Sequence, residues 1–82
     1  MFFVYSLYSK SFDKIYIGFS TDVQKRLAAH NDERNTGWTS KYRPWEIIYT
    51  EEFENKTEAL KREKQLKTSR GRSFIRGLVT NK

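Results

Sequence analysis

Two short stretches near the start of the chain have the apolar patterns of β-strands. Residues 2–8 are an apolar, aromatic and β-favouring run, and residues 14–19 follow a polar break at 9–13 with apolar Ile15, Ile17 and Phe19 at every second position. Two such stretches around a short polar segment predict an antiparallel β-hairpin. A third apolar stretch, residues 45–53, predicts another strand later in the chain.

The turn of the hairpin decides which strand residues meet. If it centres between Lys10 and Ser11, Tyr5 lies directly opposite Tyr16, with the two rings in contact on one face of the sheet. Two strand tyrosines commonly form no more than a packed aromatic pair. The pairing by itself therefore leaves open whether these tyrosines take part in chemistry.

The second strand is followed by a predicted helix over residues 22–31. Ser20 or Thr21 can accept a hydrogen bond from its first free N–H groups, and Asp22 suits its positive end. Gly18, near the end of the strand, lets backbone or ligand approach where a Cβ would block it.

Two polar side chains share the buried edge of this helix. With about 100° per residue, Arg26 and the only histidine, His30, lie beside the apolar stripe of Val23 and Leu27. A polar pair at such an edge is either satisfied within the protein or lines a site. The simple alternative is an arginine that extends to solvent and a histidine that caps the helix.

Residues 32–44 are polar and irregular. This segment interleaves rings and cations, as nucleic-acid contacts often do. The residues concerned are Trp38, Lys41, Tyr42 and Arg43. A surface loop held by one buried tryptophan is the other interpretation.

The longest predicted helix begins at Asn55 and carries two competing glutamates. Glu58 stands at the capping-box position, three residues after Asn55. Glu63 falls on the face of Ala59, so it points toward the apolar side while Glu58 points away. A carboxylate on an inward face is costly unless it is paired or holds a metal. The alternative to a metal site is a salt bridge from Glu63 to Arg26 or to a nearby lysine.

Positive charge is concentrated between residues 61 and 76, where Glu63 is the single acid. The seven basic residues there are Lys61, Arg62, Lys64, Lys67, Arg70, Arg72 and Arg76. Such a run fits contact with phosphates, although a solvated helix face in a basic protein has the same pattern. Residues 73–79 predict a short final helix that closes the core.

Composition limits the chain to one small domain, expected over residues 1–82. It has 82 residues, 16% of them aromatic, and no cysteine, so a modest core without disulfides is expected. The lack of cysteine favours the cytoplasm, and no apolar run is long enough for a membrane span. The net charge of +6 fits a polyanionic partner.

The ordered motifs resemble the GIY-YIG nuclease signature. Tyr16-Ile17-Gly18, then Arg26 and His30-Asn31, are similar to its second half, and Val4-Tyr5-Ser6 stands where the first half would be. Phe3-Val4 replaces the Gly-Ile that precedes the first tyrosine in the family. The likeness covers roughly residues 2 to 70. It extends to small single-domain bacterial members, to the nuclease subunit of structure-selective junction endonucleases and to the N-terminal domain of the repair excision nuclease.

The resemblance implies an α/β (α+β) fold with a three-stranded antiparallel sheet flanked by helices. It also implies a metal-dependent endonuclease that cuts DNA with little sequence preference, in repair or processing, with RNA not excluded. The family's catalytic glutamate closes a Glu-Ala-Leu-x-x-Glu run that matches residues 58–63, which makes Glu63 the expected ligand of Mg²⁺ or Mn²⁺. By the same resemblance Tyr5 acts as or orients the general base, Tyr16 and His30 form a relay, and Arg26 neutralises the phosphate.

The expected nucleic-acid contacts are basic residues from two segments of the chain. They are Lys41, Arg43, Lys61, Arg62, Lys64, Lys67, Arg70 and Arg72. One departure from the family concerns the metal: a later asparagine that many members carry has no counterpart, and Ile75 stands near its place.

Two other classes of function remain as alternatives. A nucleic-acid-binding module that lost turnover needs only the basic residues, whereas the joint presence of two tyrosines, an arginine, a histidine and an inward glutamate favours an enzyme. A protein-interaction domain with incidental charge would not show a steep loss of DNA affinity with salt. A partner protein that supplies specificity is compatible with so small a domain.

Overall fold

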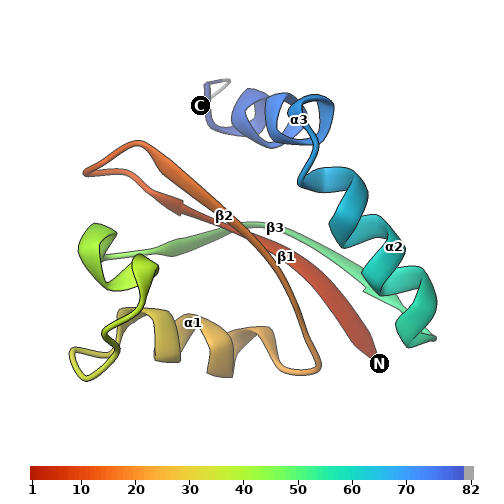
Figure 1. The fold of residues 1–82 in the computed structure, drawn as a ribbon, viewed down its shortest axis with the longest axis horizontal. Helices are drawn as coiled ribbons and strands as arrows, with labels where there is room; N and C mark the ends of the chain where they lie inside the picture. Colours follow the sequence, from red (N-terminus) through yellow and green to blue (C-terminus); the bar gives the residue numbers. More distant parts are fainter. Residues whose placement is uncertain (81–82) are drawn as a thin grey trace.

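The computed structural model describes residues 1–80 and folds them as a three-stranded antiparallel sheet with helices on both faces (Figure 1). The predicted α+β architecture is confirmed, and residues 81 and 82 of the predicted domain lie outside the described residues. In chain order the elements are β1 (Phe2–Ser9), β2 (Lys14–Ser20), α1 (Val23–Asn31), the short 3-10 helix η1 (Trp38–Tyr42), β3 (Glu46–Phe53), α2 (Lys56–Leu66) and α3 (Ser69–Thr80).

Strand β1 is the centre of the sheet, with β2 on one side and β3 on the other. It pairs antiparallel with both neighbours. Its side chains are buried on both faces: Val4 and Leu7 are fully buried, and Tyr5 is 1% exposed. A central strand covered on two sides explains the nearly continuous apolar run at the start of the sequence.

The register predicted for the hairpin is wrong by two positions. Tyr5 pairs with Gly18, and Leu7 pairs with Tyr16. The connection spans residues 10–13, and Asp13 closes it in the left-handed region, with φ 53°. Because side chains alternate with a period of two, the shift keeps both tyrosines on one face and makes them diagonal neighbours, with ring centroids 6.2 Å apart.

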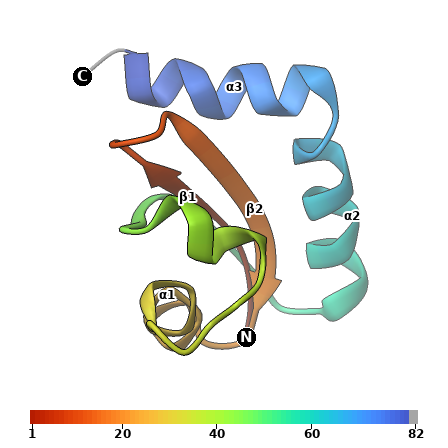
Figure 2. The same cartoon turned by 60° about the vertical axis from the view of Figure 1, so that its left-hand side comes forward.

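The sheet separates α1 and η1 from α2 and α3, as Figure 2 shows, and side chains pack on both of its faces. Helices α2 and α3 cover one face, where the core consists of Val4, Ile15, Ile17, Ala59, Leu66 and Ile75. Helix α1 and η1 cover the other face, where a second cluster consists of Tyr5, Leu7, Val23 and Trp45. The candidate catalytic tyrosine therefore belongs to the α1 layer, and Glu63 comes from a helix of the opposite layer.

Helix α1 is capped by Asp22, which corrects the prediction that Ser20 or Thr21 caps it. The Asp22 carboxylate accepts a hydrogen bond from the Lys25 N–H at 3.0 Å. The Ser20 hydroxyl accepts from the Asp22 N–H at 3.0 Å, so it shapes the turn before the helix. A carboxylate as the cap also suits the positive end of the helix.

The final helix begins at Ser69, four residues before the predicted start at 73. The Thr68 hydroxyl accepts from the Gly71 N–H at 3.2 Å and so supplies a cap that the sequence pattern did not reveal. A Cβ on Gly71 would lie 2.4 Å from the Leu66 Cα, so glycine allows α3 to turn tightly against the end of α2. No helix within residues 1–80 is long and apolar enough to cross a membrane.

Candidate active site

A row of three side chains crosses the α1 layer, from β1 through α1 to η1. The Tyr5 Oη lies 3.3 Å from His30 Nε2, and His30 Nδ1 lies 3.0 Å from Thr39 Oγ1. All three residues are buried. Since both ring nitrogens have a partner, the imidazole is fixed in orientation.

Tyr16 completes the cluster from the edge strand β2. Its ring centroid is 4.6 Å from that of His30 and 6.4 Å from that of Trp45. With the diagonal contact to Tyr5, this ring touches both ends of the Tyr5–His30 pair. The structure thus brings together Tyr5, Tyr16 and His30, as the resemblance implied.

Gly18 is the residue that allows Tyr5 to lie where it does. A Cβ on Gly18 would stand 2.6 Å from Tyr5 Oη, 2.7 Å from Tyr5 Cζ and 3.0 Å from Tyr16 Cε2. Contacts under 3.0 Å are essentially never seen for a Cβ, so the Tyr5 ring would have to shift. The backbone at Gly18 has no positive φ, so the glycine serves close approach and not an unusual backbone conformation.

The loop that carries Thr39 is fixed by residues that the sequence analysis did not assign to the site. Asn31 clamps the backbone of Trp45: its Nδ2 donates to the Trp45 carbonyl at 3.0 Å, and its Oδ1 accepts from the Trp45 N–H at 2.7 Å. The Trp45 indole donates to the Thr39 carbonyl at 2.8 Å. Asn35 Nδ2 donates to Thr39 Oγ1 at 3.3 Å. The asparagine that directly follows His30 was the one available signal.

Arg26 lies on the solvent side of the cluster. Its side chain lines a cavity of about 650 Å³ together with Tyr16, His30, Arg34 and Trp38. Burial, followed by the nearby charge of Arg26, lowers the pKa of His30 below its usual 6.5. The imidazole is therefore neutral at pH 7 and can accept a proton.

Tyr5 is shielded from ionisation. Burial is the largest cause that raises the pKa of its phenol, followed by the charge that Tyr16 would carry. Arg26 acts in the opposite direction, and the Glu63 carboxylate adds to the rise. The phenol is thus protonated at neutral pH, which fits a group that orients or relays a proton better than a free phenolate base.

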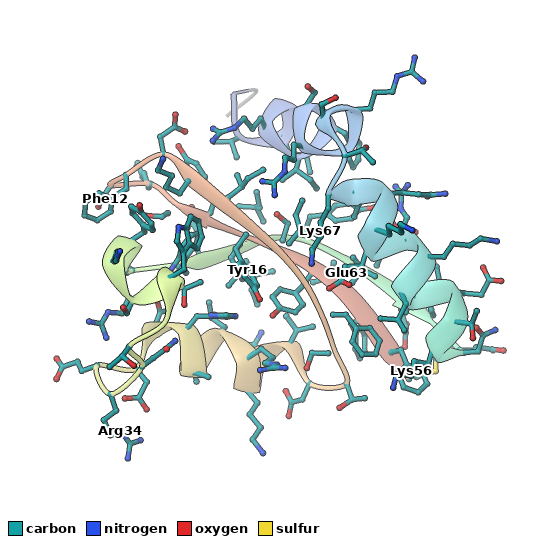
Figure 3. All side chains as sticks on the ribbon, in the orientation of Figure 1. Phe12, Tyr16, Arg34, Lys56, Glu63 and Lys67 are labelled. Carbon is teal, nitrogen blue, oxygen red and sulfur yellow. The ribbon has the colours of Figure 1, made fainter. Side chains whose placement is uncertain are left out.

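Glu63 projects from α2 toward β2, as Figure 3 shows. Its side chain is 20% exposed and forms an ion pair with Lys67, with Nζ and Oε2 3.6 Å apart. The wheel analysis is confirmed in that Glu63 is half-buried and Glu58 is exposed. The salt bridge to a nearby lysine, one of the two alternatives for Glu63, is present, yet a partly exposed pair four residues apart contributes little stability.

The chemistry of Glu63 fits a hard divalent cation. Mg²⁺ prefers oxygen ligands and is often held by one or two carboxylates while it keeps several waters. Within residues 1–80 no group of three or more His, Cys, Asp or Glu side chains is arranged for a metal. A metal at this site would accordingly rest on the single carboxylate that the sequence indicated.

Four of the predicted nucleic-acid-binding residues have a partner within the protein. Arg43 donates to the Asp32 carbonyl at 2.6 Å, and Arg62 pairs with Glu51 at 3.1 Å. Lys67 forms the ion pair described above, and Arg72 donates to the Lys67 carbonyl at 3.3 Å. Those exposed to solvent are Lys41, Lys61, Lys64, Lys67, Arg70 and Arg72.

Comparisons with known proteins agree with this architecture. A family model described as the GIY-YIG catalytic domain matches residues 1–75. The chain is 41% identical over 54 residues to a UPF0213 protein of Staphylococcus saprophyticus and 38% identical over 56 residues to one of Staphylococcus haemolyticus. The first match covers 66% of this chain and 66% of the relative, and the second covers 68% of each, so the chain spans about two thirds of the length of these relatives.

A solved structure has a similar fold. The NMR structure of a UPF0213 protein from Bacillus halodurans superposes with a TM-score of 0.55 at 28% sequence identity. The match covers 95% of this chain and 85% of the other. The sheet and helices described above are therefore shared with a protein solved by experiment.

Proposed function

Since the chain belongs to the GIY-YIG catalytic domain family, a family of nucleases, we propose that it is a metal-dependent endonuclease acting on DNA. The observation that carries the proposal is the buried Tyr5–His30 pair, 3.3 Å apart, with Arg26 at the same cavity. Packing alone would not require the hydrogen bond between the Tyr5 phenol and the His30 imidazole, which suits proton transfer.

In the proposed reaction a water molecule adds to phosphorus, one P–O ester bond breaks, and the leaving oxygen takes up a proton. Tyr5 orients the attacking water and accepts its proton as it passes its own to His30 Nε2. For Nε2 to accept this proton, the neutral His30 ring carries its own proton on Nδ1 and donates it in a hydrogen bond to Thr39 Oγ1. Arg26 offers its planar guanidinium to two oxygens of the phosphate.

Glu63 would hold the divalent cation, Mg²⁺ or Mn²⁺. When bound, such an ion supplies Lewis-acid stabilisation of the charge that develops on the phosphate. Lys67, which pairs with Glu63, would then be able to contact the substrate backbone. Phosphate contacts from the exposed basic residues bind DNA with little base readout, which fits a role in DNA repair or processing in the cytoplasm, with a partner protein supplying specificity.

A catalytically weak binding module of the same fold is the second candidate. The observation that favours it is Ile75, which stands near the place of the family's later asparagine and is fully buried in the apolar core. No polar side chain can reach the metal from that position. Glu63 would then be the only protein ligand, and turnover would be slow.

The decisive experiment measures cleavage of labelled duplex, single-stranded, flapped and branched DNA with Mg²⁺ or Mn²⁺. Wild type is compared with Glu63→Gln and, as a matched control on the same helix, with Glu58→Gln, whose side chain is exposed. Cleavage that survives Glu58→Gln and is lost in Glu63→Gln, with binding retained, supports the proposal. If wild type binds DNA in a salt-sensitive way but cleaves none of these substrates, the protein is a binding module and the proposed nuclease function is wrong.

A further inference from the structure

A row of aromatic rings runs from the tip of the β1–β2 hairpin to the candidate active site. Successive centroid distances are 5.6 Å from Phe12 to Tyr42, 4.9 Å to Trp38, 5.9 Å to Trp45 and 6.4 Å to Tyr16. Figure 3 shows its two ends, Phe12 at the hairpin tip and Tyr16 near the middle of β2. Each step lies within the range of contacting rings, so the row is continuous.

The outer members of the row present large apolar surfaces to solvent. Phe12 is 49% exposed and Trp38 is 48% exposed, whereas Trp45 is buried with 4% exposure. The Trp38 ring contacts the rings of Trp45 and Tyr42, both in tilted arrangements. Rings that are already fixed in this way lose little conformational freedom when a ligand stacks on them.

Cations accompany the rings along the row. Lys14 Nζ lies 5.5 Å from the centroid of Tyr42, and Lys41 is exposed on η1. The cavity of about 650 Å³ beside Trp38 is also lined by Arg26 and Arg34. The one carboxylate that lines this cavity, Asp32, forms an ion pair with Arg34 at 2.7 Å. The net charge of the residues that line the cavity is therefore positive.

We propose that the rings of Phe12 and Trp38 form a stacking surface for unpaired bases of a nucleic-acid strand that leads into the candidate active site. Bases expose their faces only where a strand is single, and aromatic rings with interleaved cations bind such strands without reading sequence. The position of the unpaired segment beside the cut rests on the proposed function. It follows that the preferred substrate carries a single-stranded segment next to the scissile phosphate.

An exposed apolar patch can also bind a protein. Two features favour a nucleic acid here: Lys14 lies over the Tyr42 ring of the row, and Trp38 shares its cavity with Arg26 and His30. A phosphate held by Arg26 therefore has an open aromatic surface beside it for a neighbouring base.

The test is a binding experiment without metal, so that it does not depend on cleavage. Fluorescence anisotropy in EDTA compares a labelled oligothymidylate, an oligonucleotide of the same length with abasic sites, and a blunt duplex. The variants are Trp38→Ala, Trp38→Phe and Phe12→Ala. Phe74→Ala is the matched control, since Phe74 is 46% exposed and packs on Tyr49 in the opposite layer.

We expect Trp38→Ala to weaken binding of the oligothymidylate by about tenfold, the effect of losing one base–aromatic stack. The affinities of Trp38→Ala for abasic DNA and for the duplex are expected to equal those of wild type. Trp38→Phe is expected to retain most of the wild-type affinity for the oligothymidylate, and Phe12→Ala is expected to lose less of that affinity than Trp38→Ala. Phe74→Ala leaves the ratio of single-strand to duplex affinity unchanged. Thermal melts identify any variant that fails to fold, in which case Phe12→Ala decides.

Two results would overturn the proposal. One is an equal loss for thymidylate and abasic DNA, which would mean that Trp38 acts through the fold or through charge. The other is no loss at all, which would leave a protein partner as the occupant of the rings. If the protein binds single strands in a base-dependent way but cleaves no substrate, the proposed stacking surface is supported and the proposed nuclease function is wrong. The two proposals can therefore fail independently.

Discussion

Gly18→Ala adds one methyl group beneath the ring of Tyr5. The new Cβ would lie 2.6 Å from Tyr5 Oη and 2.7 Å from Cζ, whereas carbon atoms in contact prefer about 3.5–4.0 Å. Tyr5 is 1% exposed and is bounded by the rings of Tyr16 and His30, so it cannot swing into solvent. The phenol must therefore move by about 1 Å or the strands must separate.

Two opposing effects set the size of the change in stability. Overpacking a filled interior costs about 1–3 kcal/mol, and replacing a strand glycine by alanine returns about 0.5–1 kcal/mol of backbone entropy. We expect a net loss of about 1–2 kcal/mol in the free energy of unfolding. In a domain of this size 1 kcal/mol corresponds to about 4–8 °C, so Tm falls by roughly 5–15 °C.

The assay pairs thermal and urea unfolding with DNA cleavage. A displaced Tyr5 loses its contact with His30, and a misplacement of about 1 Å costs on the order of 100-fold in rate. Gly77→Ala in α3 is the control, since an added Cβ there meets nothing within 4 Å and helix propensity favours alanine by up to about 1 kcal/mol. A Gly18→Ala protein with the stability and cleavage rate of wild type would refute the steric reasoning.

Three further predictions concern the supports of the site. Asn31→Ala leaves the Trp45 N–H and carbonyl without their partner and is expected to lower the free energy of unfolding by about 1–3 kcal/mol in urea titrations. Thr39→Val removes the oxygen that orients His30 and is expected to lower kcat with little change in KM, whereas Thr39→Ser restores it. The pKa of His30 is lowered by burial and then by Arg26, so ring-proton NMR of this only histidine is expected to give a midpoint below 6.5 that rises in Arg26→Gln. Because the unfolded chain takes up that proton first, the free energy of unfolding falls as pH drops from about 6.5 through the folded-state pKa.

Much of the architecture follows from local patterns in the sequence. The β-favouring residues before residue 20 predicted both strands of the hairpin. Asn55 was correctly predicted to cap α2, where its side chain accepts a hydrogen bond from the Glu58 N–H at 2.8 Å. The helical wheel separated the half-buried Glu63 from the exposed Glu58, since position on a helix face depends only on spacing. The ordered motif set, and not composition, indicated the nuclease family.

What the sequence could not supply depends on contacts between distant segments. The register of the hairpin depends on the left-handed backbone at Asp13, a conformation that aspartate adopts more readily than most residues but that its presence in a turn does not dictate. The hydroxyl that orients His30 comes from Thr39, nine residues away on η1, in a segment held by the Asn31 clamp. The hydrogen bonds of Thr39 and Asn31 produce no periodic pattern in the sequence, because the geometry of such a segment is set by tertiary packing and not by local propensity.

The small size of the chain forces the candidate catalytic residues to serve as core. Central strand β1 sends Val4 to one layer and Tyr5 to the other, where Tyr5 packs in one buried cluster with Leu7, Val23 and Trp45. Substituting Tyr5 or His30 therefore removes packing as well as chemistry, and a lost activity cannot be separated from a weakened fold. Arg26 is exposed and Glu63 sits at the surface of its layer, so changes there leave both cores intact. Loss of cleavage in these two positions, with melting unchanged, is the evidence that bears on mechanism.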